Sequence, residues 1–159
     1  MILLTLIFLL VDVVSKFIID RYMMVDGSIK LVNNFIYITY ARNTGAAWSI
    51  LSSNAHLVVV VSFLIITALI MYLYKNKPEN KLEKVAYSLI LGGALGNFLN
   101  RLVCGYVIDF FDFKIFKYDY PIFNFADTFI VIGVLLLIIY TWRCSNGDSG
   151  KRKQSNTNR

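Results

Sequence analysis

The chain has 159 residues, of which 57% are hydrophobic, and a formal net charge of +6 at pH 7. This apolar content excludes an ordinary soluble domain, and the length excludes a series of domains. The positive charge does not predict nucleic-acid binding, because most of the basic residues lie in segments between and after the apolar runs.

Four apolar runs approach the length of about 17–25 residues with which a helix crosses a bilayer. They cover residues 2–19, 57–74, 85–104 and 125–142. The first run lacks a basic leader and a small-residue cleavage site and contains Asp12, so we expect a retained span and not a signal peptide. The sequence therefore predicts an all-α membrane protein, a four-transmembrane-helix bundle formed by one domain over residues 1–144.

The distribution of basic residues predicts the orientation of the bundle. The short link between the second and third runs contains four of them, Lys75, Lys77, Lys81 and Lys84. A second basic group lies in the tail, residues 145–159, whose polar composition predicts disorder. The positive-inside rule places the link and the tail in the cytoplasm, and counting spans places the amino terminus there too. Residues 20–56 and 105–124 then face outward.

The first span contains Asp12, Ser15 and Lys16, which share one helix face at spacings of three and four. Two interpretations are open. Lys16 extends to the outer interface with Asp12 as its counter-ion, or Asp12 points into the bundle and orients part of a site.

The outer segment that follows is rich in β-branched and aromatic residues over residues 29–43. Asp26-Gly27 and Asn33-Asn34 mark turns within and before it. We expect a small antiparallel sheet on the membrane surface, because open strand edges leave backbone groups unpaired in lipid.

Next comes the sequence NTGAAW, in which the small residues around Gly45 permit a turn before a short interfacial helix containing Trp48. In a second interpretation, Arg42 and Asn43 contact the backbone of a bound substrate. The second span, in contrast, contains no side chains suited to chemistry.

The third span combines small and polar residues. Gly92 and Gly96 form a small-xxx-small ridge for close helix packing. Gly93, Asn97 and Arg101 recur every four residues on one helix face. Amide and guanidinium groups need partners in lipid, so their concentration here indicates a functional cluster.

Two carboxylates flank the last outer segment. Asp109 follows the third span, and Asp127 opens the fourth span on the same face as Asn124. Facing aspartates share a proton and titrate as a pair, which equips them to activate a water and to protonate a leaving amine. A helix-capping role for Asp127 is the alternative.

Other residues in this region point to no further site. We expect residues 110–116 to form a surface aromatic patch, with Asp112 solvated in a polar loop. The chain has one histidine, His56, and two cysteines, Cys104 and Cys144, at the ends of different spans. This pattern predicts neither a zinc site nor a disulfide framework, and no cofactor is expected.

Five segments in this order resemble the bacterial lipoprotein signal peptidase family, also called signal peptidase II. They are residues 12–16 (DVVSK), 43–48 (NTGAAW), 92–101 (GGALGNFLNR), 107–110 (VIDF) and 121–128 (PIFNFADT). Each motif alone is weak, but five in order on four spans are specific. One departure is Asn100, where the family usually has Asp before the arginine; we therefore expect no ion pair with Arg101 there.

The resemblance implies a four-helix aspartyl endopeptidase of the bacterial cytoplasmic membrane, with a small extracytoplasmic β-rich cradle and its active site at the outer face. One complete set of motifs on one chain predicts that a monomer suffices. It implies cleavage of diacylglyceryl-modified prolipoproteins just before the lipidated cysteine, without a metal, and inhibition by the globomycin class. Asp109 and Asp127 would be the catalytic dyad. Residues expected to support the site or bind substrate are Asp12, Lys16, Asn43, Gly45, Gly93, Asn97, Arg101 and Asn124. The glycine-rich face of the third span is the expected contact for the substrate's signal helix.

Two other functions are compatible with intramembrane carboxylates. A proton-coupled transporter would use Asp12, Asp109 and Asp127 as a relay, and an assembly factor would only pair them with Lys16 and Arg101. A relay predicts polar residues staggered through the depth of the bilayer, whereas this chain concentrates them toward the outer ends of its spans.

Overall fold

The computed structural model describes residues 1–45, 55–115 and 118–157. Its helices are α1 (Ile2–Tyr22), α2 (Ala55–Lys75), α3 (Lys81–Cys104) and α4 (Phe125–Thr157). Its strands are β1 (Ser28–Val32), β2 (Ile36–Asn43), β3 (Val107–Ile115) and β4 (Tyr118–Asp119). The helices thus form a bundle to which a small sheet is added.

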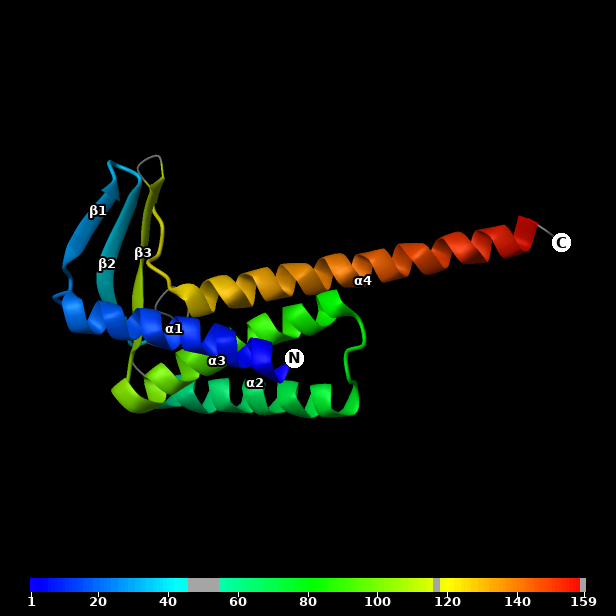
Figure 1. Cartoon of the computed structure of the whole chain (residues 1–159), viewed down its shortest axis with the longest axis horizontal. Coiled ribbons are helices and arrows are strands. Elements are labelled where there is room, and N and C mark those ends of the chain that lie inside the picture. Colours follow the sequence, from blue (N-terminus) through cyan, green and yellow to red (C-terminus); the bar gives the residue numbers. More distant parts are fainter. Residues whose placement is uncertain (46–54, 116–117, 158–159) are drawn as a thin grey trace.

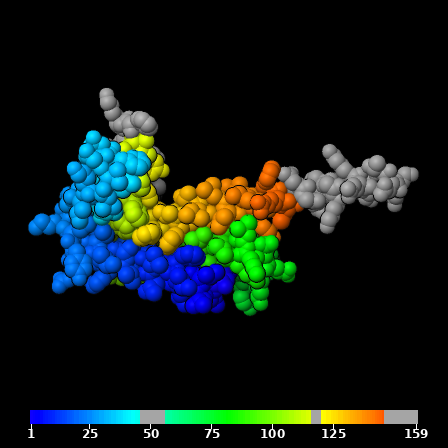
Figure 2. All heavy atoms as spheres, turned by 45° about the horizontal axis from the view of Figure 1, so that its top comes forward, coloured from blue at the N-terminus to red at the C-terminus, as the bar shows by residue number. Residues whose placement is uncertain are grey.

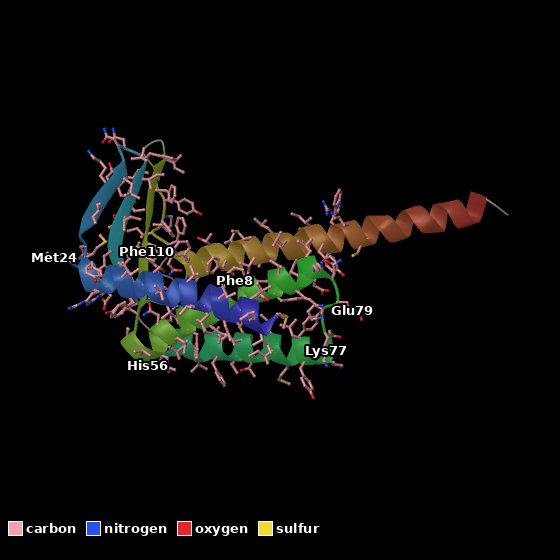
Figure 3. All side chains as sticks on the ribbon, viewed as in Figure 1. Phe8, Met24, His56, Lys77, Glu79 and Phe110 are labelled. Carbon is pink, nitrogen blue, oxygen red and sulfur yellow. The ribbon has the colours of Figure 1, made fainter. Side chains whose placement is uncertain are left out.

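The helices lie side by side, with α3 between α2 and α4 and with α1 against α3 (Figure 1). The sheet stands at one end of this bundle. The α2–α3 link, marked by Lys77 and Glu79, lies at the opposite end from Met24 and Phe110 of the sheet region (Figure 3). The basic link and the sheet are therefore separated by the length of the helices.

Within the described residues, three helices are long and apolar enough to cross a membrane: Ile2–Tyr22, His56–Lys75 and Phe125–Ser145. This agrees with three of the predicted spans. The remaining one forms α3, a helix of 24 residues with a charged first turn and Arg101 in its last turn. That α3 spans the membrane stays a prediction.

Glycines set how closely α3 approaches its neighbours. A Cβ on Gly92 would lie 2.7 Å from Cβ of Phe8, and one on Gly96 would collide with the carboxylate of Asp12, both on α1. A Cβ on Gly93 would meet the carbonyl oxygen of Ala126 on α4. The predicted small-residue ridge is confirmed. The expected docking of a substrate helix on this face is wrong, because α1 and α4 already cover it.

The small antiparallel sheet predicted over residues 29–43 is also confirmed. β1 and β2 are antiparallel, with Ile29 opposite Ile38, and Asn34 in the connecting turn has a positive φ of 56°. β2 continues the sheet by pairing with β3, so that the strand order is β1-β2-β3-β4. This second pairing brings Ala41 opposite Asp109, close to the helices.

The prediction of a surface aromatic patch over residues 110–116 is wrong for Phe110. Residues 110–115 belong to β3, where Phe110 is 3% exposed and packs with Tyr40 and Ile108 in the core beneath the sheet. Asp112 is buried and accepts a hydrogen bond from Oγ1 of Thr39 at 2.8 Å. Pairing with β2 converts an aromatic-rich segment into a half-buried strand, which the isolated sequence does not reveal.

Two further predictions concern the tail that follows the fourth predicted span and the segment around Trp48. α4 continues as a helix to Thr157 where a disordered tail was predicted from residue 145. Extending an existing helix requires no new nucleus, which favours this continuation despite the polar composition. The predicted interfacial helix with Trp48 falls within residues 46–54, outside the described residues.

Figure 2 shows the sheet and the start of α4 forming one mass from which α4 extends.

Candidate active site

A cavity of about 590 Å³ lies where the sheet meets α3 and α4. It is lined by the ends of β2 and β3, two polar residues of α3, the segment before α4, and the first turns of α4. The lining residues are Ala41, Arg42, Asn43, Asn97, Arg101, Val107, Asp109, Tyr120, Pro121, Ile122, Phe123, Asp127, Ile130 and Val131. The two predicted catalytic aspartates therefore line the same cavity.

Asp109 projects from β3 and is 3% exposed. Its carboxylate accepts hydrogen bonds from Nδ2 of Asn43 at 3.0 Å and from Nδ2 of Asn124 at 2.6 Å. Burial, reinforced by the nearby charge of Asp127, raises the pKa of Asp109 to about 6, although the two amide donors act in the opposite direction. This carboxyl group is thus able to hold a proton under mildly acidic conditions.

Asp127 lies in the first turn of α4 and forms a reciprocal cap with Asn124. Oδ1 of Asn124 accepts from the backbone N–H of Asp127 at 3.0 Å, and Oδ2 of Asp127 accepts from the backbone N–H of Asn124 at 3.2 Å. The other carboxylate oxygen, Oδ1, accepts from Nδ2 of Asn97 at 2.8 Å. The cap accounts for the hydrogen bond of Oδ2 of Asp127. It does not account for the hydrogen bond that Oδ1 accepts from Asn97 of α3.

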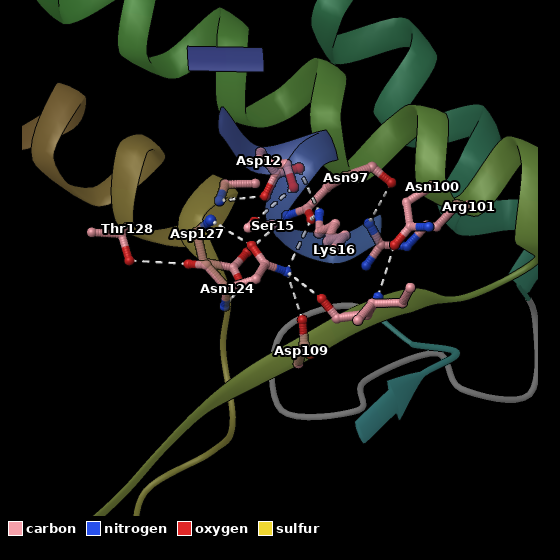
Figure 4. Close-up of polar contacts among 12 residues, drawn as sticks. Asp12, Ser15, Lys16, Asn97, Asn100, Arg101, Asp109, Asn124, Asp127 and Thr128 are labelled. Carbon is pink, nitrogen blue, oxygen red and sulfur yellow. Dashed lines mark hydrogen bonds and ion pairs between the residues drawn. The ribbon is translucent and has the colours of Figure 1, made fainter. Parts of the chain in front are cut away.

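Asn124 connects the two aspartates (Figure 4). Its side chain is fully buried, and Nδ2 donates to Asp109 and lies within hydrogen-bonding distance of Oδ1 of Asn97 (3.2 Å) and the carbonyl oxygen of Ile108 (3.3 Å). One amide therefore fixes β3, α3 and the start of α4 relative to one another.

The polar pair of α1 points into the bundle. Asp12 and Lys16 are 0% and 3% exposed, and Nζ of Lys16 lies 2.7 Å from Oδ2 of Asp12. Lys16 also donates to Oδ1 of Asn97 at 2.8 Å, while Oδ1 of Asp12 accepts from the backbone N–H of Ala126 at 2.9 Å. The interpretation in which Lys16 extends to the interface is wrong. The pair instead orients the Asn97 amide and anchors the first turn of α4.

Arg101 and Asn43 hold the segment that leaves β2. Nη2 of Arg101 donates to the carbonyl oxygen of Gly45 at 2.8 Å, and the backbone N–H of Gly45 donates to Oδ1 of Asn43 at 3.0 Å. Nε of Arg101 is buried without a hydrogen-bond partner among the described residues. Gly93 is placed differently, because it allows the close approach of Ala126 beside Asp127 and does not line the cavity.

Asn100 was not included among the predicted site residues, yet it holds the strand that carries Asp109. Its Oδ1 accepts from the backbone N–H of Ile108 at 2.8 Å. The sequence feature that points to a role for Asn100 in the site is its position beside Arg101, at the end of the polar face of α3.

The residues considered for metal or disulfide chemistry lie elsewhere. Cys104 and Cys144 are free and exposed, and His56 lies in the first turn of α2 (Figure 3). Across residues 1–45, 55–115 and 118–157, no group of three or more His, Cys, Asp or Glu side chains is arranged to hold a metal ion.

The chain is similar to known proteins over nearly its whole length. A family model described as signal peptidase (SPase) II matches residues 4–143. Lipoprotein signal peptidase of Anoxybacillus flavithermus is 39% identical over 140 residues, covering 88% of this chain and 83% of that protein. Lipoprotein signal peptidase of Staphylococcus carnosus is 44% identical over 131 residues, covering 82% of each.

Solved structures agree with the sequence comparisons. A bacterial membrane enzyme aligns with a TM-score of 0.84 at 40% identity, covering 92% of this chain and 89% of that one. A second, also a bacterial membrane enzyme, aligns with a TM-score of 0.78 at 41% identity, covering 88% and 90%. The shared sequence, fold and length establish that this chain belongs to the signal peptidase II family.

Proposed function

We propose that this protein is an aspartic endopeptidase that removes signal peptides from diacylglyceryl-modified prolipoproteins. Family membership supports the removal of lipoprotein signal peptides by a membrane protease. The observation that carries the finer proposal is the pair Asp109 and Asp127, which come from different elements, line one cavity and are joined through Asn124. The cut is proposed to fall just before the lipidated cysteine.

The proposed chemistry divides one hydrolysis between the two carboxyl groups. One carboxylate takes a proton from a water whose oxygen attacks the scissile carbonyl carbon. The protonated partner donates to the leaving amine as the carbon–nitrogen bond breaks, and the dyad again holds one proton at the end. The raised pKa of Asp109 favours this residue as the holder of the proton before substrate binds.

The remaining polar residues would keep the dyad in position. Asn97 and Asn124 donate to the carboxylates, and Lys16 fixes the Asn97 amide through its oxygen. Asn43 and Arg101, which line the cavity and both hydrogen-bond to Gly45, would form the wall where the substrate backbone enters. Preorganised donors of this kind need no rearrangement during the reaction.

We further propose that the cavity faces the outer side of the membrane and that both termini are cytoplasmic. The α2–α3 link with its lysines lies at the end of the bundle opposite the sheet (Figure 3). The positive-inside rule puts that link in the cytoplasm and hence the sheet and cavity outside. A cysteine lipidated in the outer leaflet would then reach the dyad at the headgroup layer.

α3 is proposed as the fourth span. Its 24 residues extend about 36 Å at 1.5 Å per residue, enough to cross the hydrocarbon core. α3 also packs along α1, α2 and α4, so its polar residues face protein and not lipid. With four spans the chain contains a complete set of site residues, and a monomer is the proposed active form.

The alternative functions receive less support. Asp109, Asp127 and Arg101 line the cavity. The buried pair Asp12 and Lys16 is connected to it through Ala126 and Asn97. These groups are thus gathered at one place and not spread along the helices as a proton relay requires. Simple pairing, as in an assembly factor, would not require two carboxylates to border the same open cavity.

The test is cleavage by the purified protein in detergent micelles or liposomes. We expect a diacylglyceryl-modified prolipoprotein to give two products, whose masses assign the cut to the bond before the modified cysteine. The same precursor without the lipid serves as the control. Undiminished activity in EDTA is expected, and loss in EDTA with rescue by zinc would contradict the metal-free mechanism.

A further inference from the structure

The pairing of β2 with β3 shifts by one residue just before the two strands reach the cavity. Ile38 lies opposite Phe111, whereas Ala41 lies opposite Asp109. Between these pairs, two residues of β2 stand opposite one residue of β3, which is the arrangement of a β-bulge. Tyr40 is one of the two bulged residues. A bulge next to an active site changes the direction of the side chains that follow it.

The shift decides which side chain of β2 lies beside Asp109. If the register of Ile38 continued without the extra residue, Arg42 would lie opposite Val107. In the structure Asn43 takes that place. Because side chains alternate between the faces of a strand, a slip by one residue exchanges the faces. The carboxylate of Asp109 therefore meets the amide of Asn43, which donates to it at 3.0 Å, and not the guanidinium of Arg42.

The contacts of Tyr40 hold the bulge from the side of α1. The side chain of Tyr40 is 1% exposed, and its hydroxyl donates to Oδ1 of Asp20 in the last turn of α1. The backbone N–H of Tyr40 donates to the carbonyl oxygen of Gly27 at 3.0 Å, and its carbonyl oxygen accepts from the N–H of Asp26 at 2.9 Å. Tyr40 is thus fixed to α1 and to the segment before β1, independently of the pairing with β3.

The same hydroxyl holds Arg42. Nε of Arg42 donates to the hydroxyl of Tyr40 at 3.1 Å, and the guanidinium carbon lies 4.6 Å from the centre of the Tyr106 ring. An aromatic face attracts a guanidinium, so both contacts direct this charge toward the two tyrosines. At the place of Asn43, the same charge would favour the ionised carboxylate and lower the pKa of Asp109 by about 1–3.

We propose that Tyr40 is a positioning residue, which maintains the bulge and thereby selects the side chain that lies beside Asp109. With Tyr40 in place this side chain is Asn43, and Arg42 stays on the opposite face of the strand. The catalytic consequence rests on the proposed function, in which the dyad holds one proton before substrate binds. A guanidinium beside Asp109 would keep that carboxyl group ionised and remove the proton.

Titration of the Asp109 carboxyl group by carbon-13 NMR, on the full chain in micelles, tests the proposal without requiring activity. Tyr40→Phe keeps the ring and removes the hydroxyl. We expect it to lower the pKa of Asp109 by about 1 or more, because Arg42 loses its partner. The matched control is Tyr37→Phe on the same strand, since the hydroxyl of Tyr37 accepts from the backbone N–H of Asn34 and lies outside this network. We expect the control to leave the pKa unchanged.

A second substitution distinguishes positioning from a general loss of structure. Arg42→Gln, added to Tyr40→Phe, removes the guanidinium and is expected to return the pKa of Asp109 close to that of the unaltered protein. If Tyr40→Phe does not fold, Asp20→Ala removes the acceptor of the Tyr40 hydroxyl from the exposed end of α1 and is expected to lower the same pKa. The charged groups that face Asp109 from the helices stay the same in every variant: Lys16 of α1, Arg101 of α3 and Asp127 of α4.

Three results would overturn the proposal. They are an unchanged or higher pKa of Asp109 in the folded variant that lacks the Tyr40 hydrogen bond, an equal fall in Tyr37→Phe, and no recovery when Arg42→Gln is added. Each would show that the hydroxyl of Tyr40 does not keep Arg42 from Asp109.

Turnover separates a failure of this inference from a failure of the proposed function. A pKa lower by about 1 reduces the protonated fraction of Asp109 at pH 7 about tenfold, so kcat/KM of Tyr40→Phe is expected to fall about tenfold and to recover with Arg42→Gln. If the pKa values follow the expectation but the unaltered protein cuts no precursor, the proposed function is wrong and the titration still supports the positioning. If the unaltered protein cuts the precursor but Tyr40→Phe leaves the pKa unchanged, the positioning is wrong.

Discussion

At the scale of single residues, Asn124 shows how one buried amide controls two carboxylates. Its oxygen caps α4 through the backbone of Asp127, while its nitrogen donates to Asp109. Exchanging the nitrogen for oxygen would keep the cap and lose the donor. The polarity of this side chain therefore matters more than its size.

Asn124→Asp is predicted to lower kcat about 10- to 100-fold, because a hydrogen bond to a charged group contributes about 1.5–3 kcal/mol. The matched control is Asn100→Asp, where the oxygen accepts from Ile108 and the substitution keeps that acceptor. We expect the control to retain activity close to that of the unaltered protein. Steady-state kinetics on the diacylated precursor measure both, and equal losses would contradict the assigned donor role.

The titration of Asp109 gives a second test at this scale. The charge of Asp127 helps to raise the pKa of Asp109 to about 6, so Asp127→Asn is predicted to lower that pKa. Asp109 would then lose its proton at a lower pH than in the unaltered protein. Infrared or carbon-13 NMR titration of the carboxyl group in micelles measures the shift. An unchanged or higher pKa would show that the two carboxylates do not interact.

At the scale of elements, the site depends on how closely α4 approaches α3. Gly93 lies against the carbonyl oxygen of Ala126, one residue before Asp127, whereas Gly133 packs against Ile90 and Ala86 farther along the same interface. Both glycines permit the contact between the helices. Only Gly93 does so beside the dyad.

Gly93→Ala and Gly133→Ala are both predicted to destabilise the bundle, because each added methyl group collides with α4 or α3. Gly93→Ala is predicted in addition to lower kcat by up to about 100-fold, the cost of displacing a catalytic group by about 1 Å. Thermal unfolding in detergent measures stability, and turnover at a temperature where both variants are folded measures activity. Equal turnover in the two variants would contradict a positioning role for Gly93.

What the sequence predicted at this scale depended on periodicity. Gly92 and Gly96, and the β-branched run before Asn43, follow regular spacings and were assigned correctly. The strand around Asp112 was not, because its burial comes from pairing with β2, a contact distant in sequence. The sequence leaves the direction of the Lys16 side chain open for the same reason, since its second partner, Asn97, lies on another helix. Family motifs identified the candidate dyad, but Asn100 acquired its contact only through the fold.

At the scale of the whole molecule, the sheet, the cavity and the carboxyl end of α3 share one end of the bundle, and the basic link occupies the other (Figures 1 and 3). The two native cysteines are exposed and lie at these different ends, Cys104 at the end of α3 and Cys144 far along α4. Chemical labelling of these two cysteines therefore reports which end of the bundle lies on which side of the membrane.

A membrane-impermeant maleimide is predicted to label Cys104 in intact cells and Cys144 only after the cells are permeabilised. Cys104→Ser and Cys144→Ser, each leaving one thiol, assign the label. The physical reason is the positive-inside rule applied to the link and the tail. Labelling of Cys144 in intact cells, with Cys104 protected, would reverse the orientation and place the cavity in the cytoplasm.

The central claim is that Asp109 and Asp127 together cleave the peptide bond. Its most direct measurement is turnover of a diacylglyceryl-modified prolipoprotein by Asp109→Asn, Asp127→Asn and the double variant in liposomes, with Asp112→Asn as a buried aspartate outside the cavity. We predict that each dyad variant folds, as judged by circular dichroism and thermal unfolding, and cuts no substrate. The Asp112→Asn variant is predicted to cleave the precursor under conditions in which it is folded. A folded double variant that still releases the signal peptide would contradict the account.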